Sequence, residues 1–265
     1  FFPEDFAWQG ELNADLRLDL PEAGPNGELR IDAGAGVLRL REGEVWHDFP
    51  YRTLTLDSRL RPERIDSQLR FDGGELGEVD VSTRIDPRRA IKPLEGEFRL
   101  RGLDLAVARP FAPMIERLQG ELNGSGRLAG SLQEPELRGE LRLSGGEVAG
   151  SELPVTLEQL QVRLLIDGQR LRVDGDWRSG EQGHGALSGT LDWHAAPDLD
   201  LRLSGERLPV VVEPYADLEV DPALRISLAG DQLAIAGTLR VPRGAITVRE
   251  LPPATVKVSE DARIV

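Results

Sequence analysis

The sequence predicts an all-β fold: a long, curled, mainly antiparallel sheet that forms a taco-like trough with an apolar interior, with at most one or two short helices. Apolar and charged residues alternate along most of the 265 positions, which places every second side chain on one face of a strand. The 29 glycines and 18 prolines interrupt the chain too often for a helical bundle. Only 5% of the residues are aromatic and one is Met, so the apolar face must consist of Leu, Val and Ile.

The alternation is clearest where Leu occupies even positions between charged residues, as at Leu12, Leu16, Leu18 and Leu20. Glycine pairs such as Asp72-Gly73-Gly74 mark hairpin turns between such runs. At roughly 10–13 residues per strand and turn, the chain would hold about 20 strands. Connections this short leave no room for crossover helices, so neighbouring strands should pair antiparallel. The alternating segments are 12–20, 54–60, 69–71, 79–85, 98–100, 103–107, 137–143, 160–166, 171–177, 187–193, 199–203, 208–212, 224–228, 233–241, 246–248 and 256–258.

Two segments also have helical spacing. In residues 109–118, Phe111, Met114, Ile115 and Leu118 would share one face of a helix, and a proline near the start is tolerated. We expect this helix to cap one repeat, with a plug or lid over the trough as the alternative. In residues 157–166 the unbroken alternation favours a strand.

The sequence contains an internal repeat. Gly10-Glu11-Leu12-Asn13 returns as Gly120-Glu121-Leu122-Asn123, and residues 74–86 resemble residues 180–192. We therefore expect three blocks within one continuous groove, at 1–117, 118–222 and 223–265, the last one truncated. Because the chain opens on Phe1 and ends without a closing turn, we expect an excised fragment of a longer protein.

Charge and composition exclude several functions. With 32 Lys and Arg against 46 Asp and Glu, the net charge of −14 would repel a polyanion, so no nucleic-acid partner is expected. The absence of cysteine excludes disulfides, thiolate metal sites and a cysteine nucleophile. No apolar run is long enough to cross a membrane as a helix. We expect no catalytic residues, no cofactor and no metal, and therefore no enzyme.

Three patterns look like sites and are better explained otherwise. Residues 124–129 match the dinucleotide fingerprint G-x-G-x-x-A, but no helical pattern follows, so the glycines are expected at a turn or bend. Acidic pairs such as Asp198 and Asp200 are expected on a solvated face, because 46 acids make chance pairs certain. His184 and His194 are expected near a shared hairpin, without a third zinc ligand.

A sheet with one apolar face can pack as a sandwich, close as a membrane barrel, or curl into a partly covered trough. A barrel would need more aromatic residues, and a sandwich would need larger rings to fill its centre. Glycines at inward positions (Gly139, Gly185, Gly189 and Gly237) favour a tightly curled trough with a hollow aliphatic interior. Such an interior suits acyl chains, although the same residues could pack a closed core. The predicted lining residues are Leu16, Leu18, Leu54, Leu56, Leu69, Phe71, Val79, Val81, Ile85, Phe98, Leu100, Leu141, Leu143, Val162, Leu164, Ile166, Leu171, Val173, Leu187, Leu191, Leu201, Leu203, Val210, Val212, Ile226, Leu228, Ile235, Leu239, Val241, Ile246 and Val248.

Two stretches resemble the AsmA-like superfamily, and the TamB family in particular. Residues 122–143 are similar to its pattern G-x-G-x-x-x-G-x-L…P-x-L-x-G-x-L. Residues 233–248, followed by Leu251-Pro252-Pro253, are similar to L-x-I-x-G-x-L-x-V-P-R-A-x-I-x-V…L-P in the C-terminal part of the family, with Gly244 where Ala is commoner. The resemblance covers most of residues 95–260 and reaches residues 1–95 only through the internal repeat.

The resemblance implies a periplasmic protein of Gram-negative bacteria whose inner-membrane anchor lies outside this fragment. It implies a groove that moves phospholipid acyl chains between the inner and outer membranes, and a partner, the Omp85-type outer-membrane barrel TamA. About 20 strands would give a groove of roughly 95 Å. One alternative is a chaperone or scaffold that supports outer-membrane protein assembly or secretion by β-augmentation with a client or with TamA. Another is a parallel β-helix, which would show rungs of about 20–25 residues.

Overall fold

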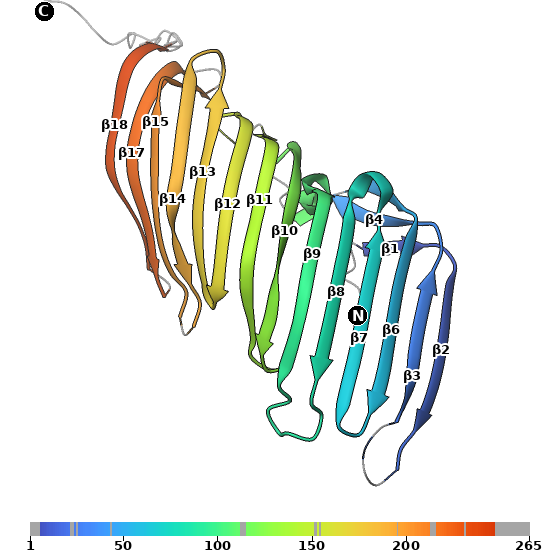
Figure 1. The fold of residues 1–265 in the computed structure, drawn as a ribbon. Helices are drawn as coiled ribbons and strands as arrows, with labels where there is room; N and C mark the ends of the chain where they lie inside the picture. Colours follow the sequence, from blue (N-terminus) through green and yellow to red (C-terminus); the bar gives the residue numbers. More distant parts are fainter. Residues whose placement is uncertain are drawn as a thin grey trace, which may run out of the picture.

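The structure is a computed structural model that describes residues 6–246 except 22–23, 25, 43, 112–114, 151–152, 154, 195, 213–215 and 231. Within these residues the chain forms eighteen strands and two 3₁₀ helices, with no α-helix (Figure 1). Every strand pairing in them is antiparallel. The predicted all-β curled sheet is confirmed.

Fifteen strands form the main sheet and three form a small second sheet. The main-sheet strands are β2 (Leu12–Asp19), β3 (Asn26–Ala33), β6 (Thr53–Arg61), β7 (Arg64–Asp72), β8 (Glu78–Ile85), β9 (Leu94–Asp104), β10 (Arg117–Gly130), β11 (Pro135–Ala149), β12 (Leu157–Gly168), β13 (Arg170–Ser179), β14 (Gly183–Asp192), β15 (Asp198–Glu206), β16 (Leu208–Val212), β17 (Ala216–Ala229) and β18 (Gln232–Ile246). The small sheet contains β1 (Phe6–Gln9), β4 (Gly36–Glu42) and β5 (Val45–Tyr51), and the 3₁₀ helices are η1 (Gly74–Leu76) and η2 (Leu105–Phe111).

The main sheet follows the chain from β2 to β18, so most neighbours are hairpin partners. β15 and β16 pair with successive parts of β17, and the break between them lies at Arg207, which has a positive φ of 50°. The sheet is therefore fourteen strand positions wide, about 62 Å at ~4.8 Å per strand. It is shorter than the expected 95 Å, because the described residues form eighteen strands rather than about 20, β1, β4 and β5 leave the main sheet, and β15 and β16 share one position. β2 and β18 each have one pairing partner among the described strands, so the sheet is not closed.

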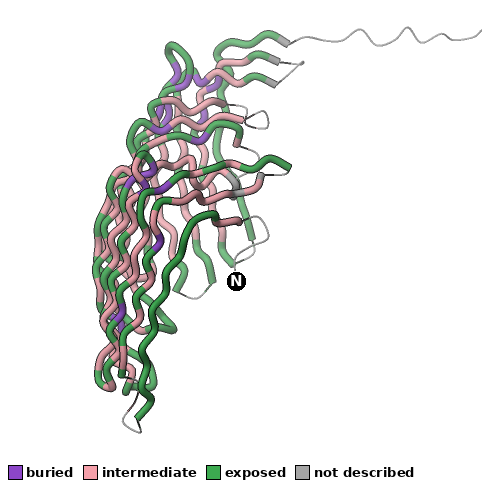
Figure 2. Tube along the Cα trace, turned by 90° about the vertical axis from the view of Figure 1, so that its right-hand side faces the viewer, coloured by how far each residue is buried: buried purple, intermediate pink, exposed green. Residues whose placement is uncertain are grey.

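The small sheet lies on the concave side of the main sheet. β3 and β6 pair directly through Ala33 and Leu54, so the β4–β5 hairpin is an excursion between two paired strands. Figure 1 draws β1 and β4 behind β6–β8, and Figure 2 shows the curvature of the sheet toward that side. The ring centroids of Tyr51 and Phe71 lie 5.9 Å apart, and Phe71 belongs to the apolar face of β7. The excursion therefore covers part of that face.

Bulges bend one end of the sheet. The register shifts within β9, β10 and β11 occur at neighbouring positions on adjacent strands. Gly120 (φ 138°) and Gly145 (φ 60°) occupy two of them with backbone angles that other residues rarely adopt. Because a bulge bends its strand and increases the local twist, aligned bulges curl the sheet inward at this end.

Few side chains are fully buried. The whole chain exposes 18575 Å², against about 11,400 Å² expected for a compact protein of 29.1 kDa. Figure 2 shows most of the buried residues along the upper part of the curved sheet. The buried hydrophobic residues are Ala33, Tyr51, Leu76, Leu94, Leu118, Trp177, Leu208 and Val220. The molecule has a sheet with a narrow core along one end, and among the described strands only the small sheet forms a second layer over part of its apolar face.

The helix predicted over residues 109–118 is wrong in type and extent. β9 ends at Asp104, whose carboxylate accepts a hydrogen bond from Ala106 N at 2.9 Å, and η2 begins there. Leu118 lies in β10 opposite Val148. Pairing with the long strand β11 gives its backbone the hydrogen bonds that a helix would otherwise provide. The alternation predicted through 103–107 ends at the same turn, whereas the strand predicted at 157–166 is confirmed as β12. Residues 112–114 lie outside the described residues.

The division into blocks at 1–117, 118–222 and 223–265 stays a prediction. The first boundary falls at the start of β10 and the second inside β17, and the main sheet continues across both.

Candidate functional site

The strand registers bring the predicted lining residues together on one face. Directly opposed residues of antiparallel strands share a face. Each register therefore shows which residues of the next strand lie on the same face. One row across the sheet contains Leu56, Leu69, Val81 and Phe98. Parallel rows in the second half contain Leu141, Leu164 and Val173, and Leu191, Leu199 and Leu228.

Three predicted residues at the C-terminal end differ in how they are placed. Ile246 pairs with Ala216 in the backbone register of β17 and β18. Val241 lies at the register shift between the partners of Glu219 and Asp221, where the alternation of β18 is interrupted. Val248 lies outside the described residues.

The apolar face is open. None of the predicted lining residues whose side chain is described is fully buried. Residues on the central strands are half-buried by their neighbours, and residues on the outer strands are more open, with Leu16 61% and Ile235 63% exposed. An apolar surface of this extent on a monomer marks an interaction surface.

The sequence reasoning missed a row of hydroxyls on this face. Ser58, Ser67 and Thr83 lie in register between two aliphatic rows. Ser58 is 9% exposed, and its hydroxyl lies 2.8 Å from that of Ser67, to which it donates. The signal was present in the sequence, because these residues have the same parity as Leu56, Leu69 and Val81.

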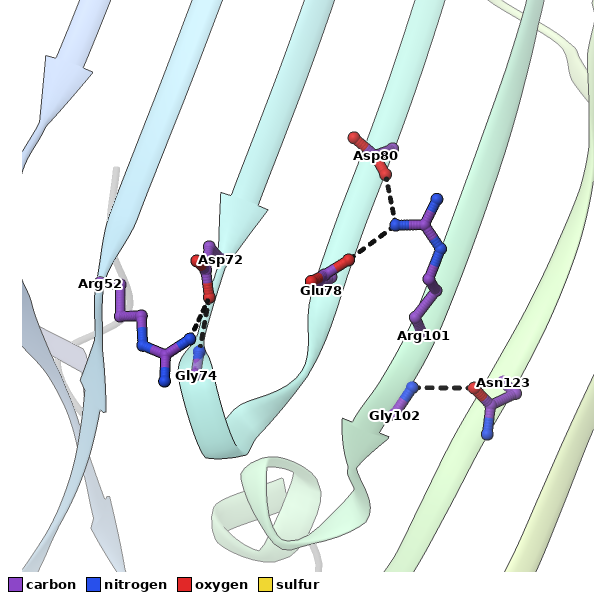
Figure 3. A network of polar contacts seen from close by, with 8 residues as sticks. All are labelled: Arg52, Asp72, Gly74, Glu78, Asp80, Arg101, Gly102 and Asn123. Carbon is purple, nitrogen blue, oxygen red and sulfur yellow. Dashed lines mark hydrogen bonds and ion pairs between the residues drawn. The ribbon is translucent and has the colours of Figure 1, made fainter.

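The opposite, convex face consists of charged residues paired across strands. In Figure 3, Arg101 contacts Glu78 at 2.6 Å and Asp80 at 3.6 Å, all on the near face of β8 and β9. Arg225 donates two hydrogen bonds of 2.8 Å to Asp200 across β17 and β15, and these bonds hold the pKa of Asp200 below its ordinary value. Exposed pairs of this kind contribute little stability, and their main effect is to keep one face hydrated.

A second pairing site on this face centres on one carboxylate. Glu140 accepts hydrogen bonds from Arg163 on β12 and from Arg142 on its own strand, and both lower its pKa. Arg142 and Arg163 oppose each other directly in the register, so the carboxylate between them offsets the repulsion of the two cations.

The sequence patterns that resemble a nucleotide site and a zinc site do not have the geometry of such sites in the structure. Residues 124–129 lie within β10 and pair with β9 and β11, without the turn and helix that a nucleotide would need. His184 and His194 lie at opposite ends of β14, so the shared hairpin expected from the sequence is wrong. His184 Nε2 lies 3.7 Å from Glu206, and His194 Nδ1 lies 2.6 Å from Gln169 Oε1. Across the described residues, no three His, Cys, Asp or Glu side chains are grouped to hold a metal ion.

Comparison with known proteins decides the family. The model of the TamB N-terminal domain matches residues 1–143, more than half of the chain. The chain belongs to the TamB family. The model of the TamB C-terminal domain matches residues 172–265. The inferred resemblance is confirmed over residues 95–143 and 172–260, and the match to the N-terminal model extends it over residues 1–95.

A curated TamB-family relative is similar over much of the chain. It is the translocation and assembly module subunit TamB of Haemophilus influenzae (strain ATCC 51907 / DSM 11121 / KW20 / Rd), 22% identical over 214 residues. The alignment covers 78% of this chain but 16% of that protein, so the chain spans a small part of the relative's length. No solved structure matches the chain. Among the described residues, no helix is long and apolar enough to span a membrane.

Proposed function

We propose that this chain is a section of a groove that conducts phospholipid acyl chains between the inner and outer membranes and so supports outer-membrane biogenesis. The chains would slide along the apolar face while the headgroups remain in water at its edge. The observation that carries the proposal is a mainly aliphatic face across a sheet fourteen strand positions wide, covered in part by the small sheet and otherwise open, behind a face of paired charges. Acyl chains need no hydrogen bonds and bind to such a lining by the hydrophobic effect alone.

The proposal has consequences for the longer protein. Its place would be the periplasm of a Gram-negative bacterium, with an inner-membrane anchor outside this chain and the outer-membrane barrel TamA as partner. The function would be conduction without catalysis, because lipids crossing along the groove undergo no reaction and need no cofactor. The name of the Haemophilus influenzae relative, a translocation and assembly module subunit, supports a role in assembly at this coarser level.

Lipid co-purification tests the proposal directly. We expect the chain, purified without detergent, to carry phospholipid that native mass spectrometry detects and solvent extraction removes. A protein that is free of lipid, and that takes up none from vesicles, would contradict the groove function.

A pair of adjacent leucines provides a matched test of the lining. Leu164 opposes Leu141 and Val173 on the concave face, whereas Leu165 opposes Glu140 and Arg172 on the convex face. Leu164→Asp should reduce bound phospholipid at least tenfold, because it places a charge on the acyl path. Leu165→Asp, with the same change one position along the same strand, should retain wild-type lipid. Equal lipid content in the two folded variants would contradict the assignment of the lining, and Leu201→Arg repeats the test on β15.

A second function is favoured by the free edge of β2. All eight residues of this strand are exposed, and β3 is its only described partner. An unpaired edge can accept a client strand or a strand of TamA by β-augmentation. Ala14→Pro would block such pairing with little change to the apolar face, because the even positions of β2 point their N–H groups to the free edge. Loss of client or TamA capture with lipid content unchanged would favour this second function.

A further inference from the structure

Two hydrogen-bond donors on the apolar face of β13 have no partner. Trp177 is 6% exposed and Ser179 is fully buried, and both lie on the concave side of the strand. Within the described part of the chain, neither the indole Nε1 of Trp177 nor Oγ of Ser179 has a hydrogen-bond partner. Leaving a buried polar group unpaired costs about 1–3 kcal/mol. A pair of such groups therefore requires an explanation.

Aliphatic side chains surround Trp177, and Ser179 lies two residues further along the same face of β13. Trp177 packs against Leu208 and Val220, and further leucines and valines pack against these three. The Trp177 ring lies over Gly185 on the neighbouring strand β14. A Cβ atom at position 185 would come within 2.2 Å of the ring, so only glycine leaves space for the indole there. Trp177 is also the one aromatic residue on the apolar face of the described strands β10–β18.

We infer that Trp177 and Ser179 bind the ester carbonyl of an acyl chain lying in the groove. This inference rests on the proposed function and identifies a place where the acyl ester binds. Both groups can donate, and an indole N–H can only donate, so the ligand must supply an acceptor. Both donors are uncharged, and the intervening Arg178 lies on the opposite face of the strand. A buried carboxylate or phosphate would need a cation, so a neutral ester carbonyl fits this site better than a free fatty acid or a headgroup phosphate.

The strand that covers the site has one pairing partner among the described strands. β16 supplies Leu208 and Val210 to the cluster, has five residues, and pairs with β17 on one side. It follows the backbone break at Arg207, where φ is positive. Displacement of β16 would expose the two donors toward the groove at the loss of five paired positions. The site is thus closed without ligand and opens into the acyl path.

A comparison of ester and ether lipids distinguishes binding at this site from binding to the groove in general. A dialkyl ether phospholipid has the headgroup and chain lengths of its diacyl counterpart but lacks both carbonyls. From vesicles containing each lipid, the wild-type chain should retain the diacyl lipid about tenfold more strongly, the effect of one or two net hydrogen bonds. Trp177→Phe combined with Ser179→Ala removes both donors and keeps the packing. It should bind the two lipids equally, at the level of the ether lipid in wild type.

Trp193→Phe is the control, because this indole is 37% exposed beyond the end of β14. It should retain the preference for the ester. Equal retention of both lipids by the wild-type chain would overturn the inference while leaving the groove function intact, and would show that the donors serve a buried water. If neither lipid is retained, the proposed function itself fails. Should the double variant not fold, Ser179→Ala alone removes one donor and should reduce the preference about threefold.

Discussion

The two halves of the main sheet have the same alternation of apolar and charged residues, but their apolar faces are sheltered in different ways. Strands β2–β9 have bulky side chains on the concave face, with a hydroxyl row at Ser58, Ser67 and Thr83, and the small sheet covers part of them. Strands β10–β18 have leucine and valine interspersed with glycine, as at Gly126, Gly139 and Gly189. The first half is covered in part by the added hairpin, whereas the second half is sheltered at one end by β16 and the cluster around Trp177. One alternation pattern is therefore compatible with two ways of sheltering an apolar face.

Filling a glycine position should have the largest effect on this difference. A Cβ atom at Gly139 would lie 2.5 Å from Ser125 O and 2.7 Å from Gly126 Cα, across the β10–β11 pair. We expect Gly139→Val to destabilise the second half by about 3 kcal/mol, because the backbone must separate. Urea unfolding monitored by tryptophan fluorescence, in a chain in which Trp8, Trp46 and Trp193 are replaced by Phe, would measure the loss.

Gly34→Ala is the control for that substitution. Nothing lies within 4 Å of a Cβ at this position, and Gly34 is not among the glycines with positive φ. Its free energy of unfolding should change by less than about 0.5 kcal/mol. An unchanged midpoint for Gly139→Val would refute close packing of the glycine strands.

Loosening the excursion should affect the first half by a smaller amount. Trp8 Nε1 donates a hydrogen bond of 2.6 Å to the Tyr51 hydroxyl, which joins β1 to β5. Tyr51→Phe should destabilise the small sheet by about 1 kcal/mol and accelerate proteolysis within residues 34–52, with strands β10–β18 unaffected. A double-mutant cycle with Trp8→Phe isolates the bond. A coupling energy of zero would mean that the excursion is held by ring packing alone.

Acid should weaken the ion-paired face, with the smallest effect of the three. The hydrogen bonds from Arg225 lower the pKa of Asp200 below its ordinary value of 3.8. A depressed folded pKa contributes stability above the unfolded pKa, and this stability is lost as the pH falls through the folded pKa. Asp200→Asn should therefore flatten the decrease in unfolding free energy below about pH 4. The difference should shrink in 1 M salt, where charges on an exposed surface are screened. Parallel pH profiles for the variant and wild type would exclude this pair as a contributor.

The fold was largely predictable because its information is local. Alternation fixes which side chains share a face of a strand, and short glycine-rich connections force neighbouring strands to pair. That the predicted residues of the central strands share one face followed in this way, and their role as a lining stays a prediction. The errors arose where tertiary pairing outweighed the local pattern: residues 117–118 have helical spacing but pair with β11, and the alternation after Asp104 continues where the strand ends. His184 and His194 were misplaced because sequence distance does not show whether a strand or a turn lies between them.

By itself, the sequence determined a single-faced antiparallel sheet with an aliphatic lining and a charged exterior, since polarity with period two acts on each strand separately. Only the tertiary structure decided that β4 and β5 leave the sheet while β3 and β6 close the gap, and that β15 and β16 share one position. It also brought Trp177 into an aliphatic cluster built partly by β16 and β17, and buried the hydroxyl of Ser179 without a partner. These features depend on contacts between strands distant in the chain, and the register and bulges that create such contacts are set by packing rather than by local pattern.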